Sequence, residues 1–370
     1  MPGRTPRRSF VEGAIHCHNV RLYGTSRQCE ATRHFSRLMQ FDKLRRRDFI
    51  TLLGGAAAWP LVARGQQPTK LPMVGFVGSD SPDAYSVLLR AFRLGLKATG
   101  FVEGQNVAIE YRWAEGRNDK LPGLAADLVG RQVDVIVAPT TPSVLAAKAA
   151  TKTIPIVFFT AGDPVDLGLV ASLSRPDGNL TGATTLTLEV GPKWLQLLHE
   201  MVPNARALAL LINPTSPNLA EAQSKELQTA AHSLGLQLHV LQASSDRDFD
   251  TAFARLTQLQ AGGLVISSDS FFFSRSDQLA TLALRHAMPT IFGFREFVAA
   301  GGLMSYGGSL TESFRWVGVY TGRVLKGEKL ANLPVQQSTK IELFINLKTS
   351  QALGVEVPPV LLTRADEVIE

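Results

Sequence analysis

The chain repeats one order of apolar runs and helical stretches, at a nearly constant spacing, between residues 72 and 292. Three turn or helix-end signals recur at equivalent points of this pattern, in the same order. Matches of this kind predict two lobes with the same topology rather than one large sheet. The paired positions are Ser81 with Ser216 and Gly100 with Gly235, each 135 residues apart, and Pro155 with Pro289, 134 residues apart.

In each half, short runs that are apolar on both faces alternate with stretches of helical spacing. Such runs are typical of strands buried in a parallel sheet whose two faces are covered by helices. The sequence therefore predicts an α/β protein of two doubly wound, Rossmann-like lobes. The predicted strands are 73–77, 107–111, 133–138 and 155–159, then 207–212, 236–241, 263–266 and 289–292. The predicted helices are 85–99, 121–130, 142–151, 219–234, 249–260, 276–286 and 312–325.

Two short segments, 181–185 and 303–307, are expected to carry the chain between the lobes. Loops at the carboxyl ends of parallel strands form the ligand crevice in sheets of this type. Two such lobes facing each other predict a hinge and an interlobe ligand cleft. The predicted organisation is a first lobe at 70–183 plus about 305–350, a second lobe at 184–304, and a tail at 350–370 that the sequence assigns to neither lobe.

The basic residues are concentrated at the start of the chain. Residues 1–65 hold 12 Lys and Arg against 4 Asp and Glu, whereas the remainder holds 26 against 28. The net charge of +6 therefore gives the body no basic surface, and no nucleic-acid partner is expected. Both cysteines, Cys17 and Cys29, also precede the body, which excludes disulfides and thiolate metal sites from it.

An export signal is predicted at residues 39–65. Arg46, Arg47 and Phe49 form a twin-arginine-like pattern, an apolar run follows, and small residues allow cleavage near Gly65. A transmembrane anchor is the alternative, but the run is short for a bilayer. The signal predicts a periplasmic protein. Residues 1–38 are interpreted as sequence upstream of a true start at Met39; a real extension is the other reading.

The loops after the predicted strands are rich in small hydrogen-bonding side chains. Thr141 is the expected N-cap of helix 142–151, where free amides attract a carboxylate, although capping alone explains the same residues. Asp163 is either a partner for an ammonium group or a turn residue before proline. Phe271 and Tyr306 are expected to stack on the ligand or to pack in the core. The candidate ligand-binding residues are Ser79, Asp80, Ser81, Thr140, Thr141, Ser143, Thr160, Asp163, Asn213, Ser216, Ser268, Asp269, Phe271 and Tyr306.

The sequence contains no nucleotide-binding, nucleophile-elbow or zinc-protease motif. Its histidines have no metal-binding spacing, so no catalytic residue, metal or cofactor is expected. Two alternatives remain. One is an exported α/β enzyme in which Asp80, Asp163 and Asp269 act as acid and base groups in the cleft. The other is an exported sensor that presents its ligand to a membrane receptor.

Over about residues 71–365 the chain resembles the ABC-transporter substrate-binding protein family, which is similar to the type I periplasmic binding proteins. The Asp-Pro and Asn-Leu-Thr-Gly strings are the more distinctive of the motifs. The resemblance is carried by Gly75-Phe-Val-Gly-Ser79, Gly104-Gln-Asn-Val107, Ile154-Pro-Ile-Val157, Gly162-Asp-Pro-Val165, Pro176-Asp-Gly-Asn-Leu-Thr-Gly182 and Leu333-Pro-Val335.

The resemblance implies the periplasmic component of an ABC importer. Such a protein captures a small polar solute, here an amino acid or related carboxylate, by lobe closure. It delivers the solute to a membrane permease with a cytoplasmic ATPase, and it is expected to be a monomer that meets the membrane only through that permease. Carried onto this sequence, the resemblance gives the carboxylate to Thr140, Thr141 and Ser143 and the ammonium group to Asp163.

Overall fold

The computed structural model describes residues 71–185, 190–338 and 340–370, which all belong to one compact unit, Pro68–Glu370. The predicted extension at 1–38 and the predicted export signal, with Arg46, Arg47, Phe49 and the cleavage near Gly65, lie outside the described residues. None of the described helices combines the length and the apolar character needed to span a bilayer.

The first lobe is built on a six-stranded sheet in the order β11-β5-β4-β3-β1-β2, and every pairing in it is parallel. Its strands are β1 (Met73–Gly78), β2 (Ala108–Trp113), β3 (Val135–Ala138), β4 (Ile156–Thr160), β5 (Leu180–Thr184) and β11 (Gln336–Gln337). Its helices are α2 (Ser86–Ala98), α3 (Leu121–Gly130), α4 (Thr141–Ala150) and α11 (Leu310–Leu325), with the 3-10 turns η1 (Asn118–Lys120) and η2 (Leu330–Asn332).

Strand β3 shows how this sheet is buried on both faces. Val135 and Val137 belong to a core that includes the apolar sides of α2 and α11, whereas Ile136 and Ala138 belong to a core shared with α3 and α4. Side chains alternate between the two faces of a strand, so a run of four apolar residues supplies two to each core. The uninterrupted apolar runs in the sequence are explained by this double burial.

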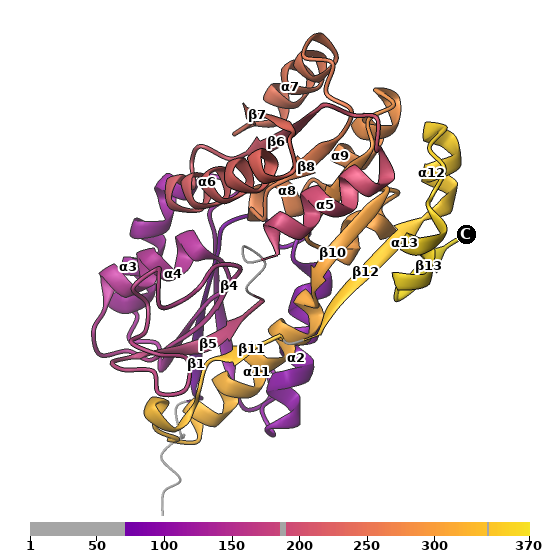
Figure 1. The fold of residues 1–370 in the computed structure, drawn as a ribbon. Helices are drawn as coiled ribbons and strands as arrows, with labels where there is room; N and C mark the ends of the chain where they lie inside the picture. The colour runs from indigo at the N-terminus through magenta and orange to yellow at the C-terminus, as the bar shows by residue number, and fades with distance from the viewer. Residues whose placement is uncertain (1–70, 186–189, 339) are drawn as a thin grey trace, which may run out of the picture. The chain divides into compact units, whose positions relative to one another are not determined.

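Helices α2 and α11 come from distant parts of the chain and lie side by side (Figure 1). Glycines make the contact possible. A Cβ on Gly95 would lie 2.0 Å from the carbonyl oxygen of Arg315, and a Cβ on Gly318 would lie 2.0 Å from that of Phe92. Real Cβ atoms do not approach a carbonyl oxygen so closely, so both positions require glycine at this crossing.

The second lobe is built on a seven-stranded sheet in the order β13-β12-β10-β9-β8-β6-β7. Its strands are β6 (Ala207–Ile212), β7 (Gln237–Gln242), β8 (Leu264–Ile266), β9 (Thr290–Phe292), β10 (Met304–Gly308), β12 (Ile341–Asn346) and β13 (Glu367–Ile369). Its helices are α5 (Gly191–Met201), α6 (Pro217–Ser233), α7 (Asp246–Gln258), α8 (Ser270–Phe273), α9 (Ser276–Arg285), α10 (Arg295–Ala299), α12 (Leu347–Leu353) and α13 (Pro359–Arg364).

The two lobes share one strand order. The first five strands of the first lobe run β2-β1-β3-β4-β5 across their sheet, and the equivalent strands of the second run β7-β6-β8-β9-β10. The predicted fold class, two α/β lobes with parallel-sheet cores, is confirmed. The chain passes from one sheet to the other after β5, after β10 and after β11.

The C-terminal part differs from the predicted organisation. Strand β12 lies within the range assigned to the first lobe, about 305–350, yet it pairs antiparallel with β10 of the second sheet. Leu343 and Ile345 of β12 lie in the core of the second lobe. The tail follows the same sheet, because β13 pairs with β12. An apolar strand carries no local signal of which sheet it extends, so the sequence pattern did not distinguish the two lobes.

Candidate ligand-binding site

Buried hydroxyl groups gather where β1, β3 and β4 end. The Oγ of Ser79 lies 2.5 Å from the Oγ1 of Thr140, and the Oγ1 atoms of Thr141 and Thr160 are 2.7 Å apart. All four residues are buried. Carboxyl ends of neighbouring parallel strands meet at one edge of a sheet, which is why residues up to 81 positions apart in sequence come together here.

Helix α4 begins at this edge with a reciprocal cap. The Oγ1 of Thr140 accepts a hydrogen bond from the amide of Ser143 at 3.3 Å, and the Oγ of Ser143 accepts one from the amide of Thr140 at 3.0 Å. The N-cap is therefore Thr140 and not Thr141, the residue predicted for that position. Thr141 is instead the first residue of the helix, where amides without partners in the helix favour an anion.

The second lobe contributes the loop after β8. Asp269 is the N-cap of α8; its Oδ1 accepts hydrogen bonds from the amide of Phe271 at 2.9 Å and from the Nδ2 of Asn213 at 2.8 Å. The carboxyl group is buried, and this burial raises its pKa above the usual range for aspartate, against the hydrogen bonds that lower it. Among the described residues its hydrogen-bond donors are the amides of Phe271 and Asn213 and the hydroxyl of Ser216, all of them neutral, so the carboxyl is desolvated without a charged partner.

The two sets of loops border one narrow pocket of about 50 Å³, which is space for a few water molecules. Thr140 and Thr141 line it from the first lobe, and Ser268 and Asp269 from the second. The remaining lining is mostly aromatic and aliphatic, and it comes from both lobes. These residues are Tyr85, Leu88, Pro142, Phe159, Ala161, Leu219, Ser270, Phe273, Phe294, Leu310 and Phe314.

Tyr85 lines the pocket and is influenced by two acidic groups of the site. Its side chain is buried, and burial raises the pKa of its phenol, with a further contribution from the charges of Asp80 and Asp269. The phenol therefore stays protonated in the physiological range and can donate a hydrogen bond. Its ring contributes apolar surface to the pocket.

Charged and polar groups connect the lobes beside the pocket. Asp80, after β1, accepts hydrogen bonds from the hydroxyl of Ser274 and from the guanidinium of Arg275, which both lie between α8 and α9. Arg275 also donates to Asp246 at 3.0 Å and lies over the ring of Phe271. These contacts hold the two rims of the pocket together.

The structure brings a subset of the predicted site residues to the pocket: Thr140, Thr141, Ser268 and Asp269. A second subset supports them by direct hydrogen bonds, namely Ser79, Ser143, Thr160 and Asn213. Ser216 belongs to this second subset as well, because it donates to Asp269. Asp80 takes part in the contact between the lobes.

The other predicted residues have local roles. Ser81 and Asp163 stabilise turns: the Oγ of Ser81 accepts from the amide of Ala84, and the Oδ1 of Asp163 accepts from the amide of Val165. Phe271 packs against Phe249 and Phe272, and Tyr306 packs on the core of the second lobe. None of these four lines the pocket.

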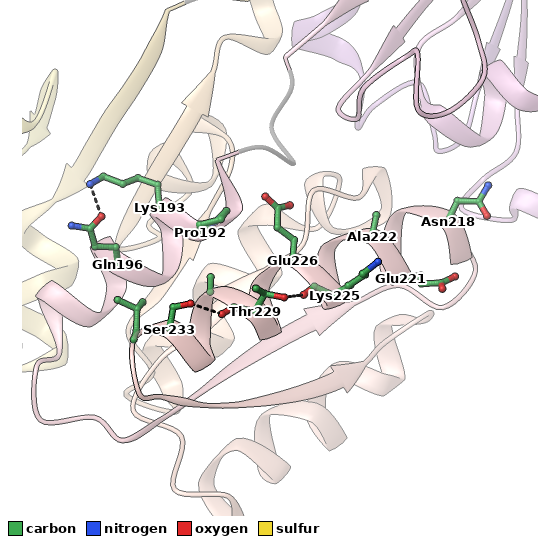
Figure 2. A pocket seen from close by; sticks show the side chains of 12 residues that line it. Pro192, Lys193, Gln196, Asn218, Glu221, Ala222, Lys225, Glu226, Thr229 and Ser233 are labelled. Atoms are coloured by element: carbon green, nitrogen blue, oxygen red, sulfur yellow. Dashed lines mark hydrogen bonds between the residues drawn. The ribbon is translucent and has the colours of Figure 1, made fainter.

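A larger groove lies between α5 and α6 (Figure 2), but it differs in character from the pocket. None of its lining residues is buried. Hydrogen bonds within single helices occur along it: Lys193 donates to Gln196 at 2.7 Å, and Thr229 donates to the carbonyl of Lys225 at 2.9 Å. This is the pattern of a solvated helical surface, so the interlobe pocket is the candidate site.

Within the described part of the chain, no three His, Cys, Asp or Glu residues are grouped so as to hold a metal ion.

Comparison with known proteins gives a consistent result. A model of the family described as ABC transporter substrate binding protein matches residues 74–369. A curated tyrosine-binding protein from Clostridioides difficile is 26% identical over 268 residues, which cover 72% of this chain and 76% of the relative.

Two solved structures are similar over 81% of this chain and the whole of theirs. One is a conserved domain protein from Vibrio cholerae, with 26% identity and a TM-score of 0.72. The other, a domain from Streptococcus pneumoniae solved with L-Trp, has 23% identity and a TM-score of 0.70 and shows the same fold. Substrate-binding proteins of ABC importers bind a small molecule for a transporter partner, act outside the cytoplasmic membrane, and are not enzymes. Because the family match spans nearly all of the described residues, this chain belongs to the ABC transporter substrate binding protein family.

Proposed function

We propose that the protein captures an aromatic amino acid between its lobes and delivers it to an ABC permease with a cytoplasmic ATPase. The observation that carries this proposal is the composition of the pocket. Aromatic rings such as Phe159, Phe273 and Phe314 border the space between a hydroxyl-rich helix start and a buried carboxyl group. The tyrosine-binding relative from Clostridioides difficile supports the same ligand class.

The two polar ends of the pocket suit the two charges of an amino acid. The hydroxyl of Thr141 and the first amides of α4 favour the ligand carboxylate. Asp269 favours the ammonium group, because a buried carboxyl with a raised pKa gains a compensating charge on binding. Asp163 is less suited to this role, since it does not line the pocket.

Lobe closure follows from where these groups lie. Thr141 belongs to the first lobe and Asp269 to the second, so a ligand that contacts both favours the closed arrangement. A ligand shifts a conformational equilibrium only by its difference in affinity for the two states. Affinity and closure are therefore expected to weaken together when either end is altered.

The ligand class is tested by calorimetric titration of the purified protein, first unfolded and refolded to remove any bound solute. The panel is L-Tyr, L-Phe and L-Trp, with L-Ala to test the rings, tyramine to test the carboxylate and 3-(4-hydroxyphenyl)propionate to test the ammonium group. We expect binding of aromatic amino acids and loss of affinity with each of the other three. Absence of binding by every aromatic amino acid would contradict the proposal.

We also propose that the protein is a monomer exported to the periplasm through the twin-arginine pathway. The support is the pattern of Arg46, Arg47 and Phe49 ahead of an apolar run and small residues near Gly65. Replacing both arginines by lysine is expected to leave the protein in the cytoplasmic fraction. Uptake of labelled ligand in cells lacking the gene tests the delivery to a permease.

A further inference from the structure

Two buried polar atoms beside the pocket have no hydrogen-bond partner among the residues that the structure describes. One is the Oγ of Ser268 and the other is the Nε2 of Gln223 on α6. Gln223 is fully buried, and Ser268 is 4% exposed. An unpaired buried polar group is destabilising, so two adjacent ones indicate a binding partner for both.

The orientation of the Gln223 amide is set by the backbone. Its Oε1 accepts a hydrogen bond from the amide of Ser268 at 3.2 Å. Turning the amide over would place its NH₂ group against that backbone N–H, two donors facing each other. The Nε2 is consequently left as a donor, while the hydroxyl of Ser268 can donate or accept.

Ser268 lies at the pocket, and Gln223 lies directly behind it, because its amide oxygen accepts the hydrogen bond from the backbone of Ser268. Ser268 lines the pocket directly, next to Asp269. Leu219 lines it from α6, and Gln223 follows one helical turn later, on the same side of that helix. A ligand side chain that passes Leu219 therefore approaches the amide of Gln223 and the hydroxyl of Ser268.

The chemistry of the pair favours a neutral oxygen. The amide of Gln223 can only donate, and the hydroxyl of Ser268 can donate or accept. The pair therefore suits a ligand atom that accepts a hydrogen bond from the amide and either donates to the hydroxyl or accepts from it. A carboxylate is disfavoured, because the adjacent Asp269 already places an acidic group in this buried environment. A phenol or alcohol hydroxyl is neutral and can form both hydrogen bonds, whereas a plain phenyl ring can form neither of them.

We propose that Gln223 and Ser268 form a polar subsite that binds the side-chain hydroxyl of the ligand, so that the pocket selects a hydroxylated aromatic amino acid over its phenyl analogue. This inference rests on the proposed function, since it takes the ligand to be an aromatic amino acid. It adds a basis for selectivity and names Gln223, which lies in the predicted helix 219–234 and is not among the candidate ligand-binding residues.

The test is the ratio of L-Tyr to L-Phe affinity, measured by calorimetry in the wild-type protein and in three variants. Gln223→Met removes the amide at similar volume, Ser268→Ala removes the hydroxyl, and Gln228→Met changes an exposed glutamine on the same helix as the control. We expect the wild type to favour L-Tyr at least about tenfold, because a polar subsite left unpaired by L-Phe rejects it. The ratio should fall to about threefold or less in the first two variants and stay unchanged in Gln228→Met.

Ser268→Ala keeps the test informative if Gln223→Met folds poorly. Its lost hydroxyl has no partner in the described structure, so the ligand-free variant is expected to unfold at the wild-type temperature or above. Equal affinity of the wild type for L-Tyr and L-Phe, or a preference that survives in both variants, overturns the subsite and assigns the two atoms to a buried water. If neither amino acid binds the wild type, the proposed function fails and the subsite fails with it.

Discussion

Asp80 of the first lobe and Arg275 of the second form an ion pair whose side chains are 6% and 22% exposed. The guanidinium is held on its other sides by Asp246 and by the ring of Phe271, and Ser274 donates to the same carboxylate. Since the partners belong to different lobes, the pair forms only when the rims of the pocket are together. It favours the closed arrangement independently of any ligand.

Replacing Arg275 by methionine is therefore expected to open the protein. The change leaves Asp80 as an unpaired carboxylate in a buried position, and breaking such a pair is strongly destabilising. We expect a larger radius of gyration by small-angle X-ray scattering and about tenfold or more loss of ligand affinity, a change of about 1.4 kcal/mol. Arg364→Met, which breaks a pair with Glu200 inside the second lobe, is the control. An unchanged radius and affinity in Arg275→Met would show that the pair does not influence closure.

Asp269→Asn is expected to separate binding from stability. Asparagine is also a good N-cap and can still accept from the amide of Phe271. Folding holds the pKa of Asp269 above its value in the unfolded chain. The folded state therefore binds this proton more tightly, and the free energy of unfolding decreases as pH rises from about 4 through the folded pKa. Asparagine does not ionise, so the variant does not lose this stability as pH rises. Near neutral pH it should therefore unfold at the same temperature as the wild type or higher.

Ligand binding should show the opposite pH dependence. An ammonium group binds the ionised form of Asp269, so the thermal stabilisation given by a bound amino acid should increase as pH rises through the raised pKa of Asp269 in the wild type and be lost in Asp269→Asn. Asp248→Asn is the control, because hydrogen bonds from Ser244 and Ser245 lower the pKa of that half-buried aspartate, which lies outside the pocket lining. It should lose stability near neutral pH and keep its ligand response. Undiminished binding in Asp269→Asn would exclude the proposed ammonium contact.

The polar part of the site was accessible from the sequence because it follows a local rule. Thr140, Thr141, Ser268 and Asp269 all come directly after predicted strands, and carboxyl ends of parallel strands share one edge of the sheet. Gln223 and Tyr85 follow no such rule. Tyr85 is the N-cap of α2 and Gln223 lies within α6, so neither follows a strand, and only the assembled lobes show that they lie beside the pocket.

The sequence pattern also does not predict contacts between segments that are far apart in the chain. Phe314 reaches the pocket on α11, which leaves the second sheet after β10 and packs on α2. The ion pair of Asp80 with Arg275 depends on how the lobes meet. The prediction for strand β12 is wrong because a single sequence gives the order of the strands along the chain but not which strands pair with each other. The repeat spacing predicts the order of strands and helices within each lobe. It does not predict which residues of one lobe contact the other.

Thr141→Val tests the carboxylate end of the site. Valine has a similar shape, so the change removes the hydroxyl that lines the pocket and leaves Thr160 with its hydrogen bond from the amide of Gly162. We expect about tenfold weaker binding of the amino acid and a stability loss of about 1 kcal/mol. Thr229→Val, which removes a hydroxyl on the exposed side of α6, serves as the control. Equal affinity of both variants by calorimetry would remove Thr141 from the binding site.

Gly318→Ala tests whether the crossing of α2 and α11 fixes the first lobe. The added methyl would lie 2.0 Å from the carbonyl oxygen of Phe92, on the backbone of the opposite helix, so the helices must separate. Overpacking of this kind costs about 1–3 kcal/mol, and α11 carries Leu310 and Phe314 to the pocket. We therefore expect a lower unfolding temperature together with weaker ligand binding. Gly123→Ala on α3 is the matched control, because a Cβ there meets no atom within 4 Å and alanine favours the helix by about 1 kcal/mol. It should raise the unfolding temperature and leave affinity unchanged, and a Gly318→Ala protein with the same behaviour would contradict the close helix contact.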